Sequence, residues 1–150
     1  MNNKYQQYAP LILRLIIGYG FMAHGWAKLS RGPAGLEKLL TQISVPMPHL
    51  NALLLPFIEL IGGLAIFVGA FITVVSIPLI LTMLVAIVTV SYKFGFSSVN
   101  TIGLTPAGPK FGPPGYEINL LYIAGLLSLM LSGAGMFSVD AWLIKRRSNA

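Results

Sequence analysis

Four long apolar stretches organise this chain, and each is long enough to cross a lipid bilayer. A transmembrane helix needs about 17–25 predominantly apolar residues. Little more than Gly69 and Ala70 separates the second stretch from the third, which predicts a tight antiparallel helical hairpin. The pattern predicts an all-α, integral membrane four-helix bundle with both termini on one face, as a single domain over 1–150. The predicted spans are about 10–27, 50–68, 71–91 and 117–136.

Two longer connections, 29–49 and 92–116, lie on the face opposite the termini if all four stretches cross the membrane. In the first connection, residues 36–40 could form a short interfacial helix. The second is dense in proline and glycine over 106–115, which disfavours a helix or a central strand there.

Composition decides between a membrane protein and a soluble one. Apolar residues make up 55% of the chain and charged residues only 9%, whereas soluble domains carry charge on about 25% of their residues. The main alternative, a helical hairpin over 50–91 buried in a soluble protein, lacks the charged shell that it would need. We therefore predict the lipid bilayer as the partner of most of the surface.

The net charge of +6 does not indicate nucleic-acid binding, because the basic residues lie mainly at the ends of the apolar stretches. Lys145, Arg146 and Arg147 follow the last stretch, a pattern typical of juxtamembrane anchors. This run favours a multi-pass protein of the inner (plasma) membrane with cytoplasmic termini.

The chain contains no cysteine, which excludes thiol redox relays, iron–sulfur clusters and thiolate zinc sites. Haem ligation would require His24 and His49 at one iron, yet His49 lies in a predicted loop, and we expect no metal site. A redox role would need an organic cofactor such as a quinone, a histidine-bound metal or a partner protein.

Charged residues inside the predicted spans cost about 2.5–3.5 kcal/mol each on insertion scales. Arg14 lies in the first span and Glu59 near the middle of the second. We expect these two to form a buried charge pair, which would either define helix register or take part in a quinone or proton site. Gly62 and Gly63 follow Glu59 within one turn and are expected to allow close helix packing.

A second polar group is expected nearer the membrane surface. Lys28 lies one helical turn after His24, and Glu117 opens the fourth stretch at the same predicted depth. We expect His24, Lys28 and Glu117 to converge on one pocket under the 92–116 connection. Two readings stay open: a ligand headgroup site, or interfacial side chains that extend to the headgroups.

These residues, taken in order, resemble the pattern of the DoxX family of bacterial membrane proteins. The resemblance covers about residues 11–140 and includes Arg14, His24-Gly25-x-x-Lys28, Glu59-x-x-Gly62-Gly63, Gly69, Glu117 and Gly133-Ala-Gly135-x-x-Ser138-x-Asp140. It implies a four-helix membrane bundle similar to the small subunit of an archaeal thiosulfate:quinone oxidoreductase, or to proteins tied to oxidative or electrophile stress. Some relatives of this kind look like membrane anchors for soluble redox enzymes.

Two functional hypotheses follow. The first is a membrane component of a quinone-linked redox or oxidative-stress system, in which His24 and Lys28 donate hydrogen bonds while Glu117 or Glu59 handles protons. The alternative is a non-catalytic membrane scaffold for a soluble redox enzyme or a second membrane subunit. A transporter is less favoured, because the chain shows no internal repeat.

Overall fold

The computed structural model describes residues 7–148, which are mostly helical. Helix α4 (Ile72–Ala86) continues through a π-helical turn, η2 (Ile87–Ser91), and a 3-10 turn, η3 (Tyr92–Phe94). Two short antiparallel strands, β1 (Thr101–Thr105) and β2 (Gly108–Phe111), form a hairpin. The α-helices are α1 (Ala9–Arg31), α2 (Pro33–Gln42), α3 (Pro48–Val68), α4 (Ile72–Ala86), α5 (Glu117–Ser132) and α6 (Val139–Ser148).

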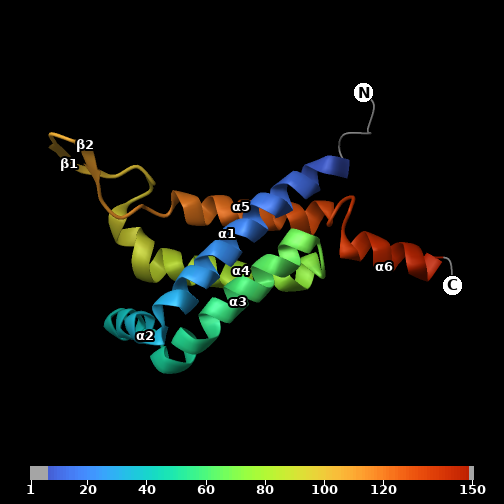
Figure 1. The fold of residues 1–150 in the computed structure, drawn as a ribbon, viewed down its shortest axis with the longest axis horizontal. Coiled ribbons are helices and arrows are strands. Elements are labelled where there is room, and N and C mark those ends of the chain that lie inside the picture. The colour runs from blue at the N-terminus through green and yellow to red at the C-terminus, as the bar shows by residue number, and fades with distance from the viewer. Residues whose placement is uncertain (1–6, 149–150) are drawn as a thin grey trace.

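Four helices pack in a closed ring, in which α1 contacts α3, α3 contacts α4, α4 contacts α5 and α5 contacts α1. The start of α1 and the end of α5 lie together, and the Met136 N–H donates to the Gln7 carbonyl at 3.3 Å. Helix α2 and the β1–β2 hairpin lie at the opposite end of the ring (Figure 1). We call these the terminal end and the loop end. The ring encloses an apolar core that includes Phe21, Ile66, Leu79, Leu126 and Leu129.

Two helical segments are long and apolar enough to cross a membrane by length and composition, Pro48–Val68 and Ile72–Phe94. They correspond to the predicted second and third spans. Helix α1 has the required length but carries Arg14, Lys28 and Arg31, and α5 has only 16 residues. These criteria therefore support two of the four predicted spans among residues 7–148.

The fourth predicted stretch differs from the structure at its end. Helix α5 stops at Ser132 and does not reach 136, because Gly133 and Gly135 adopt φ of 77° and 69°. Left-handed conformations of this kind end a helix and are readily adopted by glycine. The chain turns there and begins α6, a helix that the apolar pattern does not predict.

The loop end also departs from the sequence-based expectation. The β1–β2 hairpin forms within the proline-rich connection, and Pro109 lies on β2. A two-stranded sheet consists only of edge strands, where a missing N–H is tolerated. The short helix expected over 36–40 lies within the longer α2.

Helices α1 and α3 approach each other at three glycines. A Cβ added to Gly63 would lie 2.7 Å from the Met22 nitrogen and 2.8 Å from the Gly18 carbonyl oxygen. A Cβ on Gly25 would lie 2.6 Å from the Leu60 nitrogen. Gly62 faces α4 instead, where an added Cβ would meet the Leu79 side chain at 3.0 Å. The α1–α3 contact is therefore a backbone-to-backbone packing that requires glycine.

Gly63→Ala should lower the free energy of unfolding by about 1–3 kcal/mol, the usual cost of overpacking. The two nearest obstructing atoms belong to the α1 backbone and cannot move aside as a flexible side chain could. Unfolding in detergent micelles would measure the change. Gly35→Ala is the matched control, because an added Cβ there meets nothing within 4 Å. Equal stability of the two variants would contradict the close packing.

Candidate functional site

A buried ion pair joins α1 to α3 near the loop end. Glu59 is 1% exposed, and both of its carboxylate oxygens accept hydrogen bonds from Lys28 Nζ. The Lys28 side chain keeps 30% of its surface exposed. A buried carboxylate needs such a partner, because burial without one is strongly unfavourable. The ion pair therefore links the last turn of α1, which contains Lys28, to the centre of α3.

The predicted pair of Arg14 with Glu59 does not form. The antiparallel packing brings Gly25 level with Pro56 and Leu60, and Arg14 level with Gly69. Arg14 and Gly25 are eleven residues apart, which is about 16 Å along α1 at about 1.5 Å per residue. An arginine side chain cannot cover that distance, so Glu59 pairs with Lys28.

Arg14 is buried at the terminal end, where it is 2% exposed. Its guanidinium group donates to the carbonyls of Ala134 at 3.1 Å and Met136 at 3.0 Å, and also to the carbonyl of Phe137. These carbonyls lie just after α5, where the backbone no longer satisfies them within a helix. Arg14 therefore holds the chain segment that leads from α5 to α6.

Asp140 completes this end of the bundle from α6. Its carboxylate accepts the N–H groups of Phe71 at 2.7 Å and Ile72 at 3.1 Å, at the start of α4. Its own N–H donates to the Gly69 carbonyl at 3.0 Å. Asp140 thus caps α4 from a distant part of the chain, which suits a negative charge at a helix N-terminus. We call Arg14, Asp140 and the backbone that they bind the terminal-end cluster.

His24, Lys28 and Glu117 are not brought together as expected. The exposed His24 ring lies 6.2 Å from the Tyr122 ring of α5. Glu117 accepts hydrogen bonds from the Ser98 N–H at 2.8 Å and the Ser98 hydroxyl at 2.6 Å. The 92–116 connection thus folds back on Glu117 and supplies its donors, while Glu59 takes Lys28.

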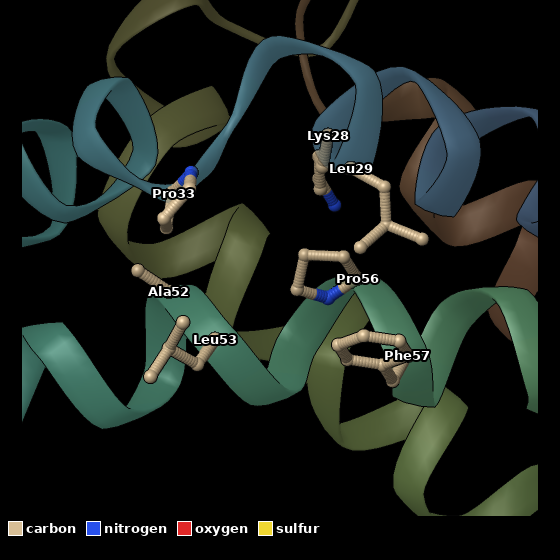
Figure 2. Close-up of a pocket in the computed structure, with 7 residues that line it drawn as sticks. All are labelled: Lys28, Leu29, Pro33, Ala52, Leu53, Pro56 and Phe57. Atoms are coloured by element: carbon tan, nitrogen blue, oxygen red, sulfur yellow. The ribbon is translucent and has the colours of Figure 1, made fainter.

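A shallow apolar pocket adjoins the Lys28–Glu59 pair, between the end of α1, the start of α2 and α3 (Figure 2). Pro56 has no N–H, so the carbonyl of Ala52 lacks its usual donor within α3. Ala52 lines the same pocket. The pocket therefore combines apolar walls with one ammonium group, that of Lys28. Its lining residues are Lys28, Leu29, Pro33, Ala52, Leu53, Pro56 and Phe57.

Sequence reasoning selected Lys28 and Glu59 but assigned them to different clusters. The signal that could have joined them is the seven-residue spacing of Gly18 and Gly25, which the pair Pro56 and Gly63 repeats on α3. Matching these two pairs in antiparallel register places Glu59 closer along the helix axis to Lys28 than to Arg14. Asp140 gave no comparable signal, because its partners are backbone groups 68 and 69 residues away. Among residues 7–148, no three His, Asp or Glu side chains gather as a metal site would require.

The ring of helices and its apolar exterior define an α-helical membrane protein with buried charges at two levels. The sequence model of the DoxX family matches residues 9–92, which run from the start of α1 to the beginning of η3. This is more than half of the chain, and the protein belongs to the DoxX family. Both Arg14 and the Lys28–Glu59 pair lie within the matched region.

Relatives extend the similarity over nearly the whole chain. "Putative oxidoreductase CatD" of Bacillus subtilis is 28% identical, covering 98% of this chain and 96% of the relative. An uncharacterized membrane protein of Mycobacterium tuberculosis is 27% identical, covering 91% of this chain and 82% of the relative. An uncharacterized protein of Haemophilus influenzae is also 27% identical, covering 97% and 100%. No solved structure matches the chain significantly.

Proposed function

We propose that α1, α3, α4 and α5 all cross the bilayer, as a multi-pass protein of the plasma membrane with cytoplasmic termini. Each helix of the ring presents large apolar side chains outward. Examples are Ile16 on α1, Ile61 on α3, Val74 on α4 and Leu131 on α5, which are 64–90% exposed. A water-facing surface would carry charge at such positions, whereas a lipid-facing one needs none.

We further propose that the protein is a membrane component of a quinone-linked redox or oxidative-stress system. The observation that carries this proposal is the buried Lys28–Glu59 pair beside an apolar pocket. A ligand site is typically apolar with a few convergent polar groups. A quinone ring requires apolar walls such as those of Leu53 and Phe57, and its oxygens require a donor such as Lys28 Nζ.

The roles of the two charged residues follow from their chemistry. Lys28 would donate a hydrogen bond to a quinone oxygen, and Glu59 would hold or release a proton beside it. A bound quinone supplies two-electron, two-proton redox chemistry. Electrons would be exchanged with a soluble redox enzyme or a second membrane subunit, because the chain has no cysteine for a cluster. The oxidoreductase name of the Bacillus subtilis relative agrees with this proposal.

Binding of a short-tailed quinone to the protein in nanodiscs would test the site. Lys28→Gln/Glu59→Gln removes both charges together and should weaken binding by about tenfold or more, which corresponds to about 1.4 kcal/mol. His24→Gln is the matched control, because His24 does not line the pocket, and it should bind as the unchanged protein does. Equal loss in both variants, or no loss in either, would contradict this site.

The β1–β2 hairpin supports the alternative, a scaffold that recruits a soluble redox enzyme. The hairpin projects from the loop end (Figure 1), and its apolar side chains Ile102, Leu104 and Phe111 are 57%, 84% and 60% exposed. An isolated two-stranded hairpin is marginally stable in water, so a covering partner would stabilise it. Absence of quinone binding by the unchanged protein would favour this alternative.

A further inference from the structure

Helix α6 projects from the terminal end of the bundle (Figure 1). It makes no extensive packing contact with another element of the described chain. Its apolar side chains are left uncovered, with Trp142 51% and Ile144 68% exposed. The guanidinium group of Arg146 lies over the Trp142 ring, 4.0 Å from its centroid. The helix thus combines large apolar groups with a cationic group outside the core.

The charge of α6 is strongly one-sided. Residues 145–147 are all basic, and Asp140 is the only acidic residue in the helix. The Asp140 carboxylate is already bound to the Phe71 and Ile72 N–H groups of α4. Asp140 lies in the first turn of α6, and the basic run lies near the other end of the helix.

We propose that α6 lies on the membrane surface and binds anionic phospholipid headgroups, and that this binding stabilises the helical bundle. Two observations favour a lipid surface as the partner. Six residues separate the end of α5 from the start of α6, so α6 begins close to the terminal end of the bundle, which lies at the membrane surface if α5 crosses the bilayer as proposed. Its basic run complements anionic headgroups, and Trp142 suits the boundary between headgroups and acyl chains.

The link to stability runs through the terminal-end cluster. Asp140 lies in the first turn of α6 and caps α4, while Arg14 binds the three carbonyls just before it. Lipids that restrain α6 also restrain Asp140 and the segment that Arg14 holds. Anionic lipid should therefore raise the unfolding temperature of the whole bundle, although the lipid contacts are made by α6, which lies outside the bundle.

Lipid binding can be measured with Trp142 as a reporter, because the chain has only two tryptophans. Trp26→Phe leaves Trp142 alone, and nanodiscs would contain brominated phosphatidylcholine with or without brominated phosphatidylglycerol. We expect stronger quenching of Trp142 with the anionic lipid. Adding Lys145→Gln/Arg146→Gln/Arg147→Gln should reduce affinity for phosphatidylglycerol by about a hundredfold, at about fivefold per basic residue. Unchanged quenching in the triple variant would overturn the proposal.

Lys93→Gln/Lys110→Gln is the matched control, because it removes two charges from the loop end and should leave Trp142 quenching unchanged. A loss of quenching in this control equal to that of the triple variant would also overturn the proposal. Basic residues anywhere in the protein would then have the same effect as those of α6.

Coupling to the bundle needs a second variant. Asp140→Asn keeps an acceptor oxygen but removes the charge that binds the α4 N-terminus. In the unchanged protein, phosphatidylglycerol should raise the unfolding temperature above that in phosphatidylcholine. In Asp140→Asn this rise should shrink while Trp142 quenching by the anionic lipid persists. An equal rise in both proteins would overturn the coupling, and quenching independent of lipid charge would overturn the lipid site itself.

Discussion

Lys28→Met should lower the free energy of unfolding by about 3–5 kcal/mol, as for other buried pairs that lose one partner. The change leaves the Glu59 carboxyl group without its partner at a position that is 1% exposed. No other basic side chain of residues 7–148 is paired with it. Unfolding equilibria in mixed micelles at neutral pH would measure the loss.

A double-mutant cycle isolates the pair from the other contacts of Lys28. Glu59→Gln alone should cost less, because Lys28 is 30% exposed and can turn toward polar surroundings. Lys28→Met/Glu59→Gln should recover much of the stability lost in Lys28→Met, since no charge then remains buried. Strictly additive effects of the two substitutions would show that the residues do not interact.

Arg14→Leu should destabilise the protein by about 3 kcal/mol or more, because hydrogen bonds to charged groups contribute about 1.5–3 kcal/mol each. Leucine fills similar space but leaves the carbonyls of Ala134, Met136 and Phe137 without their donor. Arg14→Lys should recover only part of the loss, because an ammonium group lacks the planar fork of donors. Thermal unfolding in one detergent would compare the variants.

Arg31→Leu provides the control on the same helix. Arg31 is exposed in the last turn of α1, and its loss should change stability by no more than about 0.5 kcal/mol. If Arg14→Leu were as mild as Arg31→Leu, Arg14 would not be holding the segment between α5 and α6. Proteolysis at residues 133–138 would report the same event independently, because this segment should become accessible when Arg14 is lost.

Local patterns along the chain predicted most of the helical structure. The apolar stretches marked α1, α3, α4 and α5, and the short connection at Gly69 predicted the tight turn between α3 and α4. They did not predict α6, because its few apolar residues are followed by a basic run and do not form a long apolar stretch. They also placed the end of α5 too late, since the apolar run continues through Gly133 and Gly135 while the backbone there turns left-handed.

The candidate site was predicted as a set of residues but not as a set of pairs. Arg14, Lys28 and Glu59 were selected because a charge in an apolar stretch is costly wherever it lies. Their partners were assigned from estimated depth, which has an error of several residues. Each helical residue adds about 1.5 Å, so that error is comparable to the reach of a side chain.

The sequence by itself determined that this chain is a helical membrane protein and which of its charged residues needed partners. Hydropathy and charge act through the surrounding solvent, and therefore they can be read from local composition. The tertiary structure alone decided that Lys28 binds Glu59, that Arg14 binds the end of α5 and that Asp140 caps α4. The first of these pairings depends on the axial offset between α1 and α3, which the backbone contact at Gly18, Gly25 and Gly63 determines. The other two depend on how the segment after α5 packs at the terminal end.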